Sequence, residues 1–128
     1  MESYEPYAAT FKRHADFRVK YQFLPKENDE PRYVIQGSRL DFRYDNDGYL
    51  HNSHYIIRPE FEDNGGFIIL DKWTPVEPVG TATMWIVNQK LIEYHRAHLK
   101  IGTIGYMVGG GGDIAICEVI EMLNLHQS

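Results

Sequence analysis

The sequence predicts an all-β fold, and three observations carry that prediction. Aromatic residues make up 13% of the 128 residues, and together with Val, Ile and Thr they favour strands. Several stretches alternate apolar and polar side chains with a period of two, the spacing of a strand that buries one face. Turn residues separate these stretches at roughly regular intervals, which is typical of barrels and sandwiches.

The expected strands follow from these patterns in order along the chain. The alternation is clearest at residues 17–23, and a polar turn between Pro25 and Pro31 follows it. Further strands are expected at residues 40–44, 49–57, 81–87, 103–108 and 114–123. An Asp-Asn-Asp-Gly turn at 45–48 precedes the third strand, and Pro59 is expected to end it. The glycines at 109–112 predict a hairpin between the last two strands.

Residues 89–99 depart from the strand pattern. Leu91, Ile92, His95 and Leu99 have helical spacing and fall on one face, and the intervening residues are good helix formers. This spacing predicts a short helix or helical turn near residues 89–99. A strand end followed by a connection is the alternative.

Length and charge define the domain organisation. We expect one domain at residues 15–124, with an N-terminal arm at 1–14 and a tail at 125–128. The net charge of −5 disfavours nucleic acid as the main partner, because an acidic chain repels phosphate. No apolar run approaches the roughly 20 residues that span a bilayer, so no membrane association is expected. The lone Cys117 lies in an apolar run, which predicts a buried thiol and a cytoplasmic protein.

Motifs for catalysis or cofactor binding are weak in this sequence. The glycine run lacks the Lys and hydroxyl residues of a phosphate-binding loop, so no cofactor is expected. Two histidine pairs, His51 with His54 and His95 with His98, have the same spacing. Zinc needs three or four ligands, so surface histidines are the favoured interpretation. His95 and His98 stay as the metal candidates because a helix would place them near one face.

One third of the chain interleaves basic and aromatic residues, a pattern that can bind single-stranded nucleic acid. The alternative is the solvated outer face of amphipathic strands. These residues are the candidate interface: Arg32, Tyr33, Arg39, Arg43, Tyr44, Tyr55 and Arg58.

Three segments follow one another along the chain: residues 31–42 with Gly37, Arg39 and Phe42, residues 76–80 with Pro78 and Gly80, and residues 99–120 with the glycine hairpin. In this order they resemble the C-terminal, third domain of elongation factor Tu and related translational GTPases. Residues 31–42 resemble that domain's Gly-Tyr-Arg-Pro-x-Phe segment, with Gly37, Arg39 and Phe42 matching. Residues 76–80 resemble its Pro-Gly-Asp/Glu turn, and residues 99–120 resemble its final hairpin. The likeness covers about residues 16–123. It implies a six-stranded antiparallel Greek-key barrel.

That family's domain binds its own GTPase domain, a nucleotide-exchange partner and the T-stem of aminoacyl-tRNA. The resemblance and the absence of a reactive motif therefore favour a non-catalytic protein-binding module. A basic toxin, with this chain as its immunity protein, and the translation machinery are the expected partner classes. The alternatives are binding of RNA or single-stranded nucleic acid through the Arg/Tyr group, and a small ligand- or metal-binding barrel enzyme. The edge strands also leave pairing with a second copy open.

Overall fold

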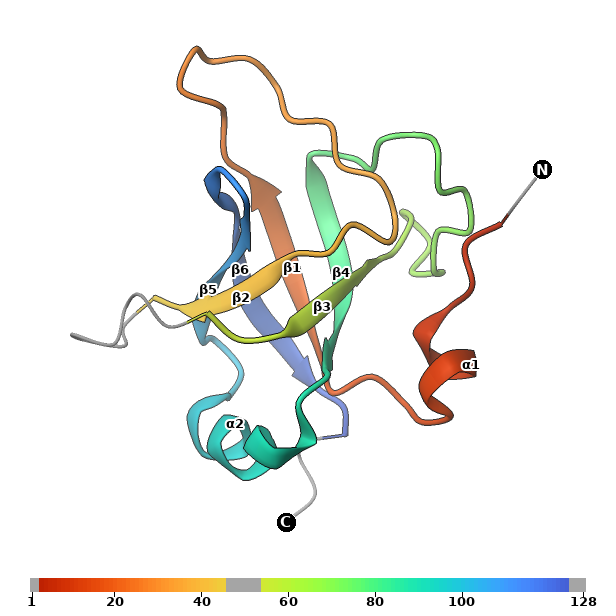
Figure 1. The fold of residues 1–128 in the computed structure, drawn as a ribbon, viewed down its shortest axis with the longest axis vertical. Coiled ribbons are helices and arrows are strands. Elements are labelled where there is room, and N and C mark those ends of the chain that lie inside the picture. Colours follow the sequence, from red (N-terminus) through yellow and green to blue (C-terminus); the bar gives the residue numbers. More distant parts are fainter. Residues whose placement is uncertain (1–2, 46–53, 125–128) are drawn as a thin grey trace.

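The computed structural model describes residues 3–45 and 54–124, and six antiparallel strands dominate it (Figure 1). The strands are hydrogen-bonded in the order β2-β5-β6-β1-β4-β3 and form one strongly curled sheet. The elements are α1 (Tyr7–Phe11), β1 (Phe17–Phe23), β2 (Asp41–Tyr44), β3 (Ile57–Phe61), β4 (Val79–Ile86), η2 (Gln89–Leu91), α2 (Ile92–His98), β5 (Ile104–Gly109) and β6 (Gly112–Met122).

The curled sheet brings its two edge strands together. Just before β3, Tyr55 exchanges two backbone hydrogen bonds with Phe42 of β2, at 2.9 and 2.7 Å. Strands β2, β3 and β4 are then consecutive neighbours, and β1 lies beside β4. This arrangement is a Greek key. The prediction of an all-β, six-stranded Greek-key barrel is therefore confirmed.

The core consists of the inward-facing side chains of the strands. In β1, four alternate residues from Phe17 to Phe23 are buried, as the period of two predicted. Phe42 lies at the centre and packs edge-on against Phe17, with ring centroids 6.0 Å apart. Gly105 on β5 makes room for it, because a Cβ there would lie 2.3 Å from Phe42 Cζ. Glycine at this position is a packing requirement.

One strand boundary differs from the sequence prediction. Pro59 does not end the third strand, because β3 runs from Ile57 to Phe61 and Pro59 pairs with Met84 of β4. The β3 ladder pairs only with β4, because the link to β2 is the single Phe42–Tyr55 bridge before β3 begins, and such an edge position tolerates a residue without an N–H. Residues 46–48 of the predicted turn and most of the strand predicted at 49–57 lie outside the described residues.

The helix predicted near residues 89–99 is confirmed as η2 followed by α2. The Asn88 side chain accepts a hydrogen bond from the Lys90 backbone N–H and begins η2. His95 and Leu99 face the core from this segment and are buried. Among the described residues, no helix combines the length and apolar character needed to cross a bilayer.

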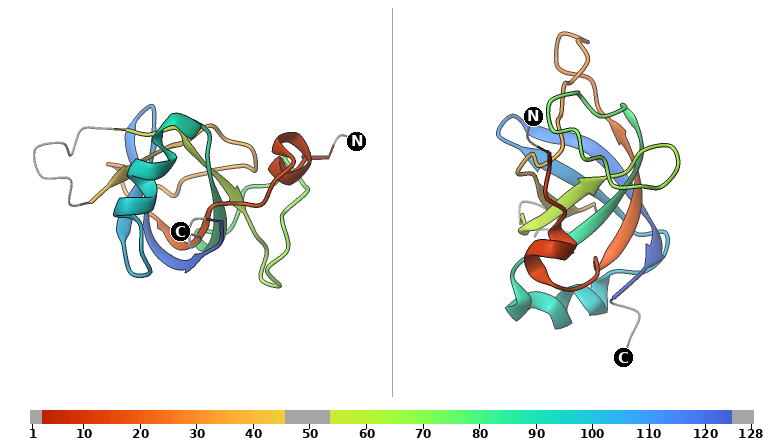
Figure 2. Two further views of the ribbon diagram at one scale, coloured as in Figure 1. Left: turned by 90° about the horizontal axis from the view of Figure 1, so that it is seen from below. Right: turned by 90° about the vertical axis from the view of Figure 1, so that its right-hand side faces the viewer.

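The connections gather at opposite ends of the barrel (Figure 1). The β1–β2 loop, the β3–β4 loop and the β5–β6 hairpin lie at one end, and α2 covers the other. The predicted glycine hairpin is present, with Gly110 and Gly111 in the turn and Gly112 at a φ of +112°. The segment containing α1 lies against the outside of β4, where Tyr7 packs on Trp85 (Figure 2).

Candidate functional site

Three of the four candidate arginines have partners within the chain. Arg43 on β2 forms two hydrogen bonds to the Asp113 carboxylate, at 2.9 and 2.7 Å, and its guanidinium lies over the Tyr106 ring. This pairing lowers the pKa of Asp113 and raises that of Arg43. Arg58 donates to the Leu40 carbonyl and pairs with Asp41. The Arg43–Asp113 pair joins β2 to β6 across β5, and the Arg58–Asp41 pair joins β3 to β2. Guanidiniums paired in this way have little capacity left for phosphate.

The remaining basic candidates lie at the loops. Arg32 donates to the Leu24 carbonyl at 2.6 Å and to the Asp113 carbonyl at 3.3 Å, so it fastens the β1–β2 loop to the β5–β6 hairpin. Arg39 is exposed. Tyr33 is 74% exposed and lines a groove beside Arg32. Of the seven candidates, Tyr33 is the one that presents a large aromatic surface to solvent.

Tyr44 and Tyr55 belong to a cluster that packs α2 onto the barrel, which we call the helix-end cluster: Tyr44, Tyr55, Tyr94, His95 and His98. The Tyr44 hydroxyl and His95 Nδ1 lie 2.7 Å apart, and both residues are buried. Burial, with a smaller contribution from the charge of His98, lowers the pKa of His95 to about 4. The favoured interpretation of His95 as a surface histidine is therefore wrong.

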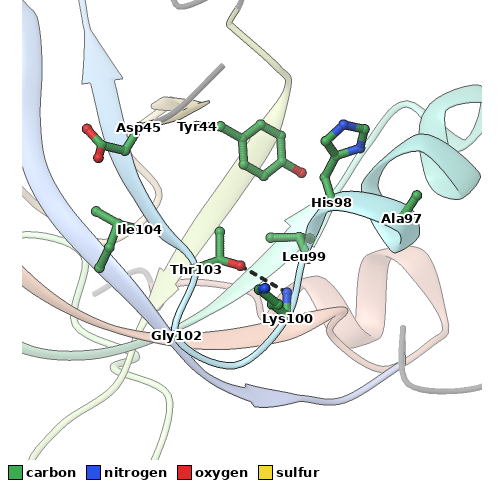
Figure 3. Close-up of a pocket in the computed structure, with 9 residues that line it drawn as sticks. All are labelled: Tyr44, Asp45, Ala97, His98, Leu99, Lys100, Gly102, Thr103 and Ile104. Atoms are coloured by element: carbon green, nitrogen blue, oxygen red, sulfur yellow. Dashed lines mark hydrogen bonds between the residues drawn. The ribbon is translucent and has the colours of Figure 1, made fainter. Parts of the chain in front are cut away.

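The second metal candidate, His98, lies at the solvent side of the same cluster. Its ring stacks on Tyr94 at 4.1 Å, and its Nδ1 lies 2.7 Å from the Tyr94 carbonyl. Beside it lies a pocket of about 460 Å³, lined by nine residues that include Tyr44, Leu99 and Thr103 (Figure 3). Within residues 3–45 and 54–124, no three His, Cys, Asp or Glu side chains are positioned to hold a metal ion. Of the other pair, His54 is exposed and His51 lies outside the described residues.

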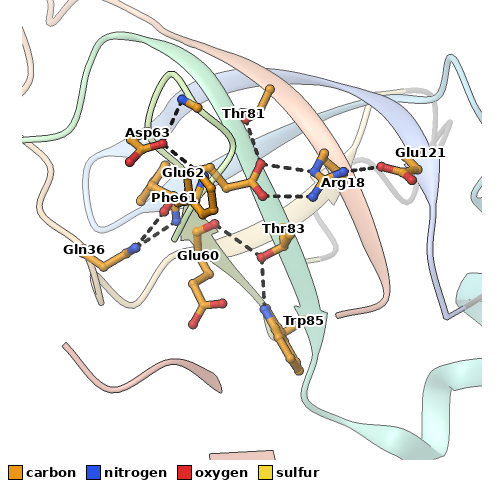
Figure 4. A network of polar contacts seen from close by, with 12 residues as sticks. Arg18, Gln36, Glu60, Phe61, Glu62, Asp63, Thr81, Thr83, Trp85 and Glu121 are labelled. Atoms are coloured by element: carbon orange, nitrogen blue, oxygen red, sulfur yellow. Dashed lines mark hydrogen bonds and ion pairs between the residues drawn. The ribbon is translucent and has the colours of Figure 1, made fainter. Parts of the chain in front are cut away.

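A buried polar network lies on the outer face of β3 and β4, and the sequence analysis missed it (Figure 4). Glu62 binds Arg18 through both carboxylate oxygens, at 3.1 and 3.0 Å, and accepts a hydrogen bond from Thr81. Glu60 is buried nearby and accepts hydrogen bonds from the N-terminal segment. The alternation of apolar and acidic residues at 57–62 places both carboxylates on the outer face, but it gives no sign of their burial.

The single cysteine is chemically inert in this fold. Cys117 on β6 is buried in the core, and burial raises the pKa of its thiol to about 12. The prediction of a buried thiol is confirmed, and thiolate chemistry at neutral pH is disfavoured.

The long loops at the other end of the barrel are joined to one another. The Val76 backbone N–H donates to the Val34 carbonyl at 2.7 Å, and both valines are buried. The Gln36 side chain is buried between the loops, where it donates to the carbonyls of Phe61 and Ile69 and accepts from the Phe61 N–H. These contacts hold the two loops as one preformed surface.

Exposed apolar side chains line grooves on this surface, which we call the loop face: Tyr33, Pro75, Pro78 and Val79. We include Trp73 in the loop face because it is exposed in the same β3–β4 loop, two residues before Pro75. Trp73 is 62% and Val79 61% exposed. Tyr33, Pro75 and Pro78 line a groove of about 370 Å³, and Pro75 and Val79 line a second groove of about 230 Å³. Pro75 and Val76 line both grooves, so the two grooves are adjacent.

Acidic side chains surround the loop face. Residues 24–40 and 62–79 carry seven acidic and four basic side chains. One of the acidic residues, Glu62, is buried and paired with Arg18, so the others leave a net charge of −2. Asp71 and Glu77 line the second groove and are exposed. Hydrogen bonds from the Thr74 hydroxyl and two backbone N–H groups lower the pKa of Asp71, so this carboxylate stays charged. The surface therefore combines an apolar centre with a negative border.

No protein-family model matches the chain, and no curated protein matches it. The likeness to the C-terminal barrel of elongation factor Tu therefore stays a prediction from sequence motifs.

Proposed function

We propose that this protein is a non-catalytic protein-binding module and that its loop face docks on a basic surface of the partner. The observation that carries the proposal is the group of exposed apolar residues on the loop face, set within an excess of acidic side chains. Protein interfaces commonly have an apolar centre rich in Tyr and Trp and a polar border. Contiguous exposed apolar patches are otherwise uncommon on monomeric proteins.

The preformed geometry of the loops favours tight recognition. Binding is weakened when a loop must be ordered, and the Val34–Val76 and Gln36 contacts order these loops before a partner arrives. The negative border would speed association with a basic partner and would make the affinity fall with added salt. Both features support a specific protein partner.

The charge distribution also narrows the partner class. Phosphate would be repelled by the acidic loop face, and Arg32, Arg43 and Arg58 are already paired within the chain. Nucleic acid is therefore the less favoured alternative. A basic toxin or nuclease neutralised by this chain, and a basic protein of the translation machinery, both have the required chemistry. The resemblance to the elongation factor Tu barrel supports the second of these.

The test is capture of a partner with the immobilised full-length protein, followed by mass-spectrometric identification and titration of the purified partner. Trp73→Ala and Tyr33→Ala are each expected to weaken binding about tenfold or more, as for central interface aromatics. Ile101→Ala is the matched control, because Ile101 is 66% exposed and lies near α2 at the other end of the barrel. Equal weakening by the control variant, or affinity that does not fall as salt rises, would contradict the proposal.

A further inference from the structure

The outer face of β3 and β4 is buried although it points away from the core. Trp85 is 2% and Glu60 1% exposed, and both alternate with core residues along their strands. Residues 3–11, which we call the arm, cover them (Figure 2). Glu60, Thr83 and Trp85 therefore form a site that is filled by a peptide segment of the same chain, and we call it the arm site.

The arm is held by aromatic contacts and hydrogen bonds. Tyr7 and Phe11 place their ring centroids 5.8 Å from that of Trp85. The Glu60 carboxylate accepts a hydrogen bond from the Tyr4 hydroxyl at 2.7 Å and another from the Tyr7 backbone N–H at 2.6 Å. Helix α1 has only five residues and buries none of them. The Tyr4 backbone N–H also donates to the Leu70 carbonyl at 2.8 Å. The arm's position therefore depends on these contacts with the body and not on a core of its own.

A single residue joins the arm to the body of the protein. Lys12 has a φ of +56°, in the left-handed region that non-glycine residues rarely adopt. The next residue, Arg13, already belongs to the body: it binds the Asp16 carboxylate, donates to the Ile86 carbonyl at 2.8 Å and lies over the Trp85 ring. Lys12 is thus a short, strained hinge, a feature that favours exchange of an element between copies.

We propose that the arm exchanges between two copies of this chain, so that each arm fills the arm site of the other copy. The exchanged arm would make the same contacts with Glu60 and Trp85, while Lys12 would relax to an extended conformation. A groove of about 670 Å³ runs beside the arm and includes Pro6, Ala8 and Phe67, of which Phe67 is 73% exposed. This groove gives the second barrel an apolar surface to pack on.

The first test changes the hinge and measures mass by light scattering over a range of protein concentrations. Lys12→Pro forbids a positive φ, so it should raise the dimer association constant about tenfold or more for each hinge. Lys12→Gly removes the strain from the monomer and should lower the dimer association constant below that of the wild type. Asp29 is the matched control position, because it is the other described non-glycine residue with positive φ and its N–H also closes a turn. Asp29→Pro and Asp29→Gly should leave the mass unchanged.

A second test separates arm exchange from other dimers. One chain carries Trp85→Ala in the arm site, and the other, isotopically labelled, carries Tyr7→Ala and Phe11→Ala in the arm; both also carry Lys12→Pro. Only a mixed dimer contains an intact arm in an intact arm site. Native mass spectrometry should therefore show the heterodimer in at least a tenfold excess over either homodimer. A Lys12→Pro protein that stays monomeric, or folded chains that mix without this preference, would overturn the proposal. Neither experiment involves the partner proposed for the loop face.

Discussion

The two ends of the barrel use aromatic residues in opposite ways. At the helix-end cluster, the rings of Tyr44, Tyr55, Tyr94, His95 and His98 contact one another, with centroid separations from 4.1 Å for Tyr94–His98 to 6.5 Å for Tyr44–Tyr94. At the loop face, Tyr33 and Trp73 are 74% and 62% exposed. The charge also differs, because residues 87–103 carry three basic and one acidic side chain, whereas the loops are acidic.

This difference indicates that the helix-end cluster contributes to the stability of the fold, whereas the loop face is available for recognition of a partner. Rings that contact other rings lose water on folding and contribute to the free energy of unfolding. Rings that remain in water contribute little to folding and can lose that water when a partner binds. Mutations at the helix-end cluster should therefore lower stability, and mutations at the loop face should lower binding.

The largest effect is expected at His95. His95→Ala removes a fully buried ring and leaves the Tyr44 hydroxyl without its partner, so the free energy of unfolding should fall by about 3 kcal/mol. Urea denaturation followed by circular dichroism measures this. His98→Ala is the control, because His98 is exposed and its loss should cost under about 1 kcal/mol. Equal losses in the two variants would show that the buried Tyr44–His95 contact does not hold α2 in place.

The next effect is a dependence of stability on pH. The pKa of His95 is about 4 in the folded protein, against 6.5 ordinarily, so the unfolded chain binds a proton more readily between these values. Its contribution to stability is complete above about pH 6.5, falls as the pH drops towards 4, and amounts to at most about 3 kcal/mol. His95→Gln removes this group, so its stability deficit relative to the wild type should shrink as the pH falls. A deficit that stays constant from pH 7 to pH 4 would contradict this assignment.

Local sequence patterns predicted much of the fold. The alternation in residues 17–23 gives β1 at its observed bounds, and the helical spacing at 89–99 gives η2 and α2. The prediction that Pro59 ends a strand was wrong. A strand tolerates a proline at the edge of a sheet but not between two neighbours, and its place in the sheet depends on the whole chain.

The site was harder to predict than the fold, because the burial of each candidate depends on residues distant in sequence. No sequence pattern indicated a partner for Arg43, but in the fold β6 places Asp113 beside it. Glu60 is buried only because the arm folds back over β3. Trp73 and Val79 were not selected as candidates from the sequence, because they are apolar residues in a proline-containing loop. The β1–β2 loop contributes Tyr33 to a groove that Pro75 and Pro78 of the β3–β4 loop also line, a juxtaposition that no local pattern predicts.

A smaller effect is expected from the hydroxyl of Tyr44. Tyr44→Phe keeps the ring in the cluster but leaves His95 Nδ1 buried without this hydrogen bond, so the free energy of unfolding should fall by about 1–2 kcal/mol. The measurement is the same urea titration, with Tyr33→Phe as the matched control because its hydroxyl lies on an exposed side chain. A loss in Tyr44→Phe no larger than in the control would show that ring packing alone fixes α2.

The smallest effect on stability, and the sharpest separation of the two ends, is expected at the loop face. Tyr33→Ala and Trp73→Ala remove side chains that are already in water, so each should change the free energy of unfolding by no more than about 0.5 kcal/mol. Both variants should nevertheless lose partner binding, whereas Tyr44→Phe should retain it while being less stable. A thermal melt and a partner titration on the same three proteins measure both quantities. If Trp73→Ala instead destabilised the protein as much as Tyr44→Phe, the Trp73 ring would be needed for the loops to fold. That result would contradict the proposal that the loop face is a docking surface.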